Sequence, residues 1–178
     1  MRVTIPWPLP AFTDLDDAAL EALRGETKRV VRKGRRKDVE AHTQKSWELE
    51  STEQPERTYR LFTRQAKAGS HIFSCGLVLV LPGRSLTLCR YNGPYHRHRN
   101  PLAPRARCSS EVAHRHLAIA SYLTAGLPGD RYAMTDGRFT SLDGALHYAT
   151  QDCGIIGIDT EPEQTSLWER MQPSDGRQ

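Results

Sequence analysis

The chain has 178 residues and a formal net charge of +4, with 26% charged and 38% hydrophobic residues, a composition that is typical of one soluble domain and excludes a fibre. Its longest apolar run, "LVLVL" at 77–81, is far too short to cross a bilayer. The opening "MRVTIPWPLPAF" lacks the continuous apolar stretch of a signal peptide, so we expect a cytoplasmic protein.

The chain is expected to begin with an irregular, proline-interrupted segment over 1–12, followed by a helix. In "TDLDDAALEALRG", Thr13 or Asp14 can cap the helix and Gly25 can end it. The apolar residues of this segment fall on one helical face, namely Leu15, Ala19, Leu20 and Leu23.

A strongly basic segment comes next. "KRVVRKGRRK", at 28–37, has seven basic residues in ten and is expected to form a second helix or an arm that breaks at Gly34. Such a cluster is typical of polyanion binding and equally of a solvated surface. For the first case we expect Arg32, Arg35, Arg36 and Lys37 to contact the substrate.

Between about 44 and 91 the apolar residues recur at every second position, which is typical of strands. "KSWELES", "RTYRLFTRQ", "HIFSCGLVLVL" and "SLTLCRYN" predict four strands, with a turn at "PGR" over 82–84. Short connections indicate an antiparallel meander that is covered on one face by helices.

The second half predicts two helices. One runs from 109 or 110 to Thr124, and the other opens with the capping box "TSLD" at 140–143 and stops at Gly154. Between them "DRYAMTDGRF" predicts a short strand and a turn, and 158–178 is expected to be a mobile polar tail. The fold class is therefore α+β: one domain over 13–157, with an antiparallel meander of about four strands packed against two or three helices.

The four cysteines show no C-x-x-C spacing. With no signal for an oxidising compartment, we expect reduced and mostly buried thiols.

The segment "NGPYHRHRNP" over 92–101 carries the densest chemistry. Its prolines favour an extended backbone, in which His96 and His98 point to one side and Arg97 and Arg99 to the other. Two imidazoles can supply a proton acceptor and a proton donor, and arginines can hold a phosphate. These groups are what metal-independent RNA cleavage requires. The alternative is a solvated basic loop.

A second triplet, "HRH", lies at 114–116 within the predicted helix. Helical positions two apart diverge by about 200°, so only one of its histidines can face a given site. His116 lies near the centre of the apolar face, whereas His114 lies opposite. We therefore expect His116 to be either a supporting catalytic group or a core histidine with a hydrogen-bond partner.

Two other chemistries remain open. His96 and His98 could bind zinc or another transition metal, with His116 or a cysteine completing the set, although the interleaved arginines would repel a cation. The same basic surface could also belong to a binding module without catalysis. We expect no cofactor. Further predicted substrate contacts are Arg90, Tyr91 and Tyr95, which flank the loop.

The order of these features resembles the small TumE-type toxins of bacterial toxin–antitoxin pairs. The resemblance covers about 71–153, and its most specific part is "RYNGPYHRH" at 90–98. It implies a compact α+β toxin that a partner neutralises, commonly a helix-turn-helix antitoxin. The residues that match the family pattern are Arg90, Tyr91, Asn92, His96, Arg97 and His98. RNA as the substrate follows from the placement of the histidines and arginines.

Overall fold

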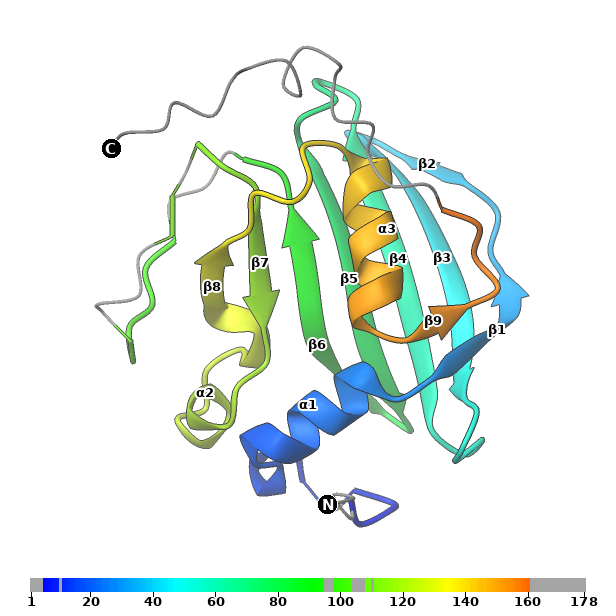
Figure 1. Ribbon diagram of the computed structural model, residues 1–178, viewed down its shortest axis with the longest axis vertical. Coiled ribbons are helices and arrows are strands. Elements are labelled where there is room, and N and C mark those ends of the chain that lie inside the picture. Colours follow the sequence, from blue (N-terminus) through cyan, green and yellow to red (C-terminus); the bar gives the residue numbers. More distant parts are fainter. Residues whose placement is uncertain (1–4, 10, 95–97, 104–107, 110, 161–178) are drawn as a thin grey trace, which may run out of the picture.

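The computed structural model describes residues 5–9, 11–94, 98–103, 108–109 and 111–160. Within these ranges nine strands form one sheet in the order β8-β7-β6-β5-β4-β3-β1-β9, with β2 paired to β3 (Figure 1). The strands are β1 (Lys28–Lys33), β2 (Lys37–Val39), β3 (His42–Ser51), β4 (Thr58–Ala66), β5 (Phe73–Leu81), β6 (Arg84–Asn92), β7 (His114–Leu117), β8 (Tyr132–Thr135) and β9 (Ile155–Ile156). The helices are α1 (Asp17–Gly25), α2 (Ala120–Thr124) and α3 (Leu142–Asp152), with single 3-10 turns at η1 (Phe12–Asp14) and η2 (Gly129–Arg131).

The α+β class is confirmed, and the four predicted strands form the consecutive antiparallel run β3 to β6. The sheet is larger than a four-stranded meander because the basic segment and the second half of the chain add strands at both ends. The only parallel pairing among the described strands joins β1 to β9.

The main core lies between the sheet and α3, which crosses one face of the sheet in Figure 1. Alternate residues of the central strands, such as Leu61, Leu77 and Cys89, are buried on this side together with Ala145 and Ala149 of α3. Burial of a leucine-sized side chain stabilises the fold by about 1.5–3 kcal/mol, so this layer fixes which face of each strand points inward.

Two predicted helices are confirmed, with small changes at their ends. Helix α1 is capped by Asp16, whose Oδ1 accepts a hydrogen bond from Ala19 N at 2.7 Å, in place of Thr13 or Asp14. Helix α3 is capped by Ser141, within the predicted capping box, and Gly154 follows it with φ +60°. A positive φ favours glycine because it has no Cβ.

The basic segment forms strands β1 and β2, so the prediction of a second helix or an arm was wrong. Arginines of β1 lie opposite glutamates of β3, and Arg32 pairs with Glu48. Lys28 is fully buried, and its Nζ donates to the carbonyls of Arg24, Glu26 and Cys153 at 2.8–3.1 Å. Cross-strand charge pairs and this buried contact favour the extended form.

The predicted helix over 109–124 was also wrong in its first half. Residues 114–117 form β7, which pairs with Cys89–Asn92 of β6, and only Ala120–Thr124 is helical. The apolar pattern of this segment fits both the period of a helix and the period of a strand. The backbone edge of β6 favours the strand, because it offers hydrogen bonds that a helix would leave unmade. Among the described residues, no helix is long and apolar enough to span a membrane.

Candidate functional site

Three histidines meet at one end of the sheet. Because β7 is a strand, His114 and His116 point to the same side of the sheet, and His98 joins them from the loop that follows β6. The ring centroids lie 4.3 Å (His98–His114), 4.5 Å (His98–His116) and 5.1 Å (His114–His116) apart. One ligand nitrogen from each ring lies within 4.8 Å of the others. We call His98, His114 and His116 the histidine cluster.

The histidine cluster lies on the face of the sheet opposite α3. Arg115, between the two strand histidines, points to the α3 side and binds Asp152 Oδ2 at 3.0 Å. Tyr91 is its register partner and also contacts Asp152 Oδ2, at 2.8 Å. The neighbouring pair Arg90 and His116 therefore shares the other face.

The loop after β6 is fixed to the edge of β8 by Asn100. Its buried side-chain amide donates to Ala133 O at 2.8 Å and accepts from Ala133 N at 2.9 Å, as a neighbouring strand would. His98 also forms an isolated antiparallel bridge with Cys108, and Ser109 N donates to Thr135 Oγ1 at 3.0 Å. These contacts hold His98 over the two strand histidines.

His116 is buried and neutral. Its Nδ1 lies 2.8 Å from the carbonyl oxygen of Asp130, which can only accept, so Nδ1 carries the proton and Nε2 carries a lone pair. Burial, followed by the charges of Arg90 and of the other two rings, lowers the pKa of His116 to about 3. The buried Nε2 has no hydrogen-bond partner among the described residues.

His114 is fully buried beside Asn92, its register partner on β6. The distance between Asn92 Nδ2 and His114 Nε2 is 3.4 Å. A side-chain amide can turn either its nitrogen or its oxygen toward a ring, so Asn92 can set the tautomer of His114.

Arginines line the same face. Arg60 and Arg64 of β4 alternate with Phe62, and Phe62 lies across Gly76 from Arg90. We call the side of the sheet that carries Arg60, Arg64 and Arg90 the arginine face. Arg90 pairs with Asp130 at 3.3 Å, whereas no ion pair is found for Arg60 or Arg64 among the described residues.

Described residues of the arginine face line two neighbouring hollows. One, of about 250 Å³, is lined by Arg64, Arg90, Asn92 and His98 among others. The other, of about 300 Å³, shares Arg64 and Arg90 with the first and adds Arg60 and Phe62. Because the hollows share two arginines, they form neighbouring subsites that lead away from the histidine cluster.

The structure brings only some of the predicted site residues together. It brings together His98, His116 and Arg90. Arg99 is exposed in the same loop. His96, Arg97 and Tyr95 lie outside the described residues. Tyr91 is buried on the opposite face, in contact with Asp152, and does not reach the cluster.

The basic residues predicted to contact substrate are far from the histidines. Arg32, Arg35, Arg36 and Lys37 belong to β1, β2 and their connection, which lie at the opposite end of the sheet from β7 (Figure 1). Arg36 lines a separate cavity of about 440 Å³ that also includes Trp47 and Leu142.

Sequence reasoning missed three residues of this site, His114, Arg60 and Arg64. The signal for His114 was the two-residue alternation in "HRHL", which was outweighed by the assignment of a helix. The signal for the arginines was the alternation of Arg60, Phe62 and Arg64 in "RTYRLFTRQ", but register across strands cannot be seen in one segment.

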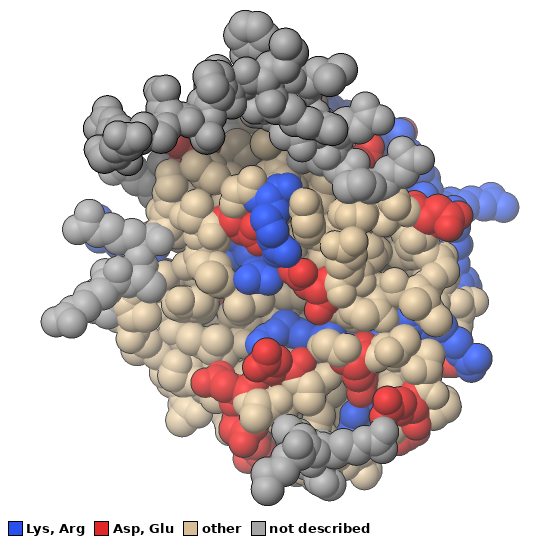
Figure 2. Space-filling model, viewed as in Figure 1, with Lys and Arg blue, Asp and Glu red and all other residues tan. Residues whose placement is uncertain are grey.

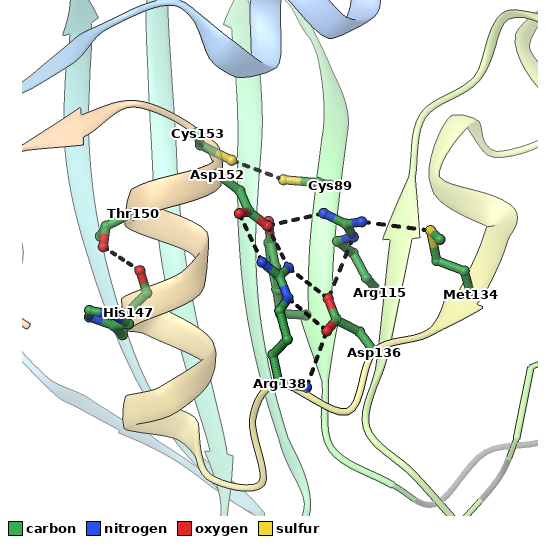
Figure 3. A network of polar contacts seen from close by, with 10 residues as sticks. Cys89, Arg115, Met134, Asp136, Arg138, His147, Thr150, Asp152 and Cys153 are labelled. Carbon is green, nitrogen blue, oxygen red and sulfur yellow. Dashed lines mark hydrogen bonds and ion pairs between the residues drawn. The ribbon is translucent and has the colours of Figure 1, made fainter. Parts of the chain in front are cut away.

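The opposite face carries a balanced charge network beside α3 (Figure 3). Arg138 binds Asp136 Oδ2 at 2.8 Å and Asp152 Oδ2 at 2.7 Å, and Arg115 joins both carboxylates. Figure 2, in the same direction of view as Figure 1, shows basic and acidic side chains next to one another on this face. The charges of two arginines and two aspartates cancel in this network. The network therefore connects α3 to the sheet and does not form an anion site.

Comparison of the chain with protein-family models, with curated proteins and with solved structures finds no match. The arginine face and the histidine cluster are therefore the features from which a function can be inferred.

Proposed function

We propose that the protein cleaves RNA on the arginine face, with the histidine cluster as the reactive group. The observation that carries this proposal is the placement of three imidazoles beside a hollow that Arg64 and Arg90 also line. Arg64 is exposed and its Nε donates to the neutral Oε1 of Gln44 at 3.0 Å, so it has no ion pair among the described residues. Such a guanidinium favours an anionic ligand and matches the oxygens of phosphate.

Features next to the arginines favour a nucleic acid over a simple anion. The guanidinium of Arg64 lies over the ring of Phe62, with 5.1 Å from Cζ to the centroid, within the second hollow. Aromatic rings and arginine planes are the groups on which single-stranded bases stack. Two adjoining hollows that share their arginines suit a phosphate between two nucleosides.

The reaction that fits these groups is attack of the ribose 2′-oxygen on the adjacent phosphorus with departure of the 5′-oxygen. Arg64 and Arg90 would bind the phosphate and stabilise the charge that develops on it. The scheme in which His116 donates a proton as an imidazolium is disfavoured, because the pKa of His116 is lowered to about 3 and the ring is neutral at pH 7. Activation of the 2′-hydroxyl therefore depends on a lone pair of the cluster, and the ring that accepts this proton would return it to the leaving 5′-oxygen.

The TumE-type resemblance supports a second part of the proposal, that the protein is a toxin neutralised by a partner of the helix-turn-helix class. Induced expression should then arrest growth and degrade RNA, and co-expression of the neighbouring small reading frame should restore growth. Arrest that is unchanged by His98→Ala would separate toxicity from this site.

The direct test is cleavage of a labelled single-stranded RNA by the purified chain. We expect His98→Gln to abolish cleavage and Arg64→Ala to weaken RNA binding with a smaller salt dependence. Arg36→Ala, on the other face, is the matched control and should keep full cleavage. Salt-dependent binding without cleavage would replace the enzyme with a binding module, and equal effects of Arg64→Ala and Arg36→Ala would overturn the assignment of the arginine face.

A further inference from the structure

We propose that the histidine cluster binds a divalent transition metal of the zinc class through one nitrogen of each of His98, His114 and His116. The sequence pattern offered His96 and His98, with His116 or a cysteine, as possible metal ligands; it did not predict this set, because His114 was assigned to a helix face that pointed away. The binding itself is independent of RNA, whereas the catalytic role of the metal rests on the proposed function.

The distances suit such a site. In a tetrahedral zinc site with bonds of about 2.0–2.1 Å, two ligand nitrogens lie roughly 3.3 Å apart. The three ligand nitrogens of the cluster lie within 4.8 Å of one another. Closing this difference needs only small side-chain rotations. His98 is the member most able to move, because it belongs to a loop and is half-buried while the other two are fixed in β7.

The tautomer of His116 is already set for metal binding. Its Nδ1 donates to the Asp130 carbonyl at 2.8 Å, which leaves the lone pair on the buried Nε2. Metal-ligating histidines commonly donate their other ring nitrogen to a carbonyl in this way, which fixes the orientation of the ring. Asn92 can take the same role for His114 when its amide turns Oδ1, in place of Nδ2, toward Nε2 of the ring, 3.4 Å away.

Without a cation, the same arrangement is unfavourable. The buried Nε2 of His116 has no hydrogen-bond partner among the described residues, although a buried polar atom without a partner costs free energy. A metal ion supplies the missing partner. A satisfied core histidine, the alternative role for His116, would bind protein groups through both nitrogens.

The surrounding charge permits a cation. Arg90 is the register partner of His116 on β6, and Asp130 pairs with it at 3.3 Å, so its charge is partly balanced. Three neutral imidazoles would leave the ion its full positive charge. They would also leave a fourth position for water or for an oxygen of the substrate. The hollow that His98 lines with Arg64 and Arg90 lies beside the cluster.

With a metal bound, the lone pairs of the cluster are occupied by the ion, and a metal-bound hydroxide would act as the base in their place. A zinc-bound hydroxide takes the proton of the 2′-hydroxyl and becomes zinc-bound water. The 2′-oxygen then forms a bond to phosphorus while the bond from phosphorus to the 5′-oxygen breaks. The zinc-bound water returns a proton to the leaving 5′-oxygen, which regenerates the hydroxide. The products are a 2′,3′-cyclic phosphate and a free 5′-hydroxyl, and no other reactant is consumed.

The experiment is titration of the untagged, chelator-treated chain with Zn²⁺ by calorimetry, and with Co²⁺ followed by its visible absorption. We expect about one ion per chain, with a Co²⁺ spectrum typical of low coordination number. Loss of a partner that only orients a ligand weakens metal binding by about 10- to 100-fold, so His98→Ala should weaken it by at least about 100-fold. His42→Ala, on β3 far from the cluster, should leave the affinity unchanged.

Circular dichroism confirms that each variant is folded, and His98 is chosen because it lies in a loop. His116→Gln is the second variant and should also weaken binding. A folded wild-type chain that takes up no Zn²⁺ or Co²⁺, or a His98→Ala variant with unchanged affinity, would overturn the metal site. RNA cleavage that persists in the metal-free chain would overturn its catalytic role while leaving the proposed function intact. Stoichiometric metal binding by a chain that cleaves no RNA would overturn the proposed function and leave the metal site intact.

Discussion

Asn100 connects the stability of the fold to the position of His98, and Asn100→Ala is therefore an informative perturbation. The asparagine is 3% exposed, and its amide makes two hydrogen bonds with the backbone of Ala133. Removing the amide leaves one N–H and one carbonyl of β8 without these bonds. It also frees the loop two residues after His98.

The expected loss of stability follows from these two bonds. A hydrogen bond contributes about 0.5–1.5 kcal/mol net, and leaving a buried polar group unsatisfied costs about 1–3 kcal/mol. Water can reach part of the β8 edge once the side chain is gone, so we expect a loss of about 2–4 kcal/mol in the free energy of unfolding. Asn100→Asp keeps an acceptor for Ala133 N but buries a carboxylate against Ala133 O, so at neutral pH it should destabilise the chain at least as much as Asn100→Ala.

Urea denaturation followed by circular dichroism measures the change in stability, and Zn²⁺ titration of the folded protein measures the effect on the site. Asn100→Ala should lower both, because the loop that carries His98 loses its main attachment. A stability change below about 0.5 kcal/mol, the range usual for surface substitutions, together with unchanged Zn²⁺ affinity would refute this account of the loop.

Three further predictions follow from other parts of the fold. Burial alone would raise the pKa of Asp136 and Asp152, but hydrogen bonds from Arg138 outweigh burial and hold both pKa values below the usual range. The two carboxylates should therefore stabilise the fold fully above about pH 4, and this stabilisation should be lost as the pH falls further. Gly93→Ala should destabilise the chain in urea, since a Cβ there would lie 2.1 Å from the backbone oxygen of His71. Lys28→Met should lower the thermal midpoint, because three carbonyls lose their donor.

Each of these predictions has its own control. Asp152→Asn should reduce the loss of stability in acid, and an unchanged acid transition would contradict the assigned role of the network. Gly83→Ala, where a Cβ has open space but φ is +74°, separates backbone strain from the clash at Gly93; equal costs at the two positions would argue against the clash. A Lys28→Met variant as stable as the wild type would mean that water replaces the ammonium.

The sequence predicted the central layer of the fold well. The alternation from Trp47 to Asn92 and the capping box before α3 are local signals, and each acts within a few residues. The short strand predicted in "DRYAMTDGRF" is β8. Strands β1 and β7 were missed because they depend on partners elsewhere in the chain. Arg32 is held in strand β1 by its ion pair with Glu48 of β3. Strand β7 forms because it pairs with the edge of β6.

The candidate site was predicted in part for the same reason. His98 was found because it lies in a proline-bounded segment, and Arg90 because it flanks that segment. His114 was discarded by a geometric argument that was sound for a helix but did not apply, since positions two apart share one side in a strand. The relation of Arg60 and Arg64 to the histidines depends on the register of β4, β5 and β6, which a single sequence does not reveal.

The most direct test of the histidine cluster is anomalous diffraction from crystals of the untagged chain grown with Zn²⁺, recorded on both sides of the zinc absorption edge. The account predicts one strong peak about 2.0–2.1 Å from a nitrogen of each of His98, His114 and His116. A peak bound elsewhere on the chain, or an empty cluster in crystals saturated with Zn²⁺, would contradict it.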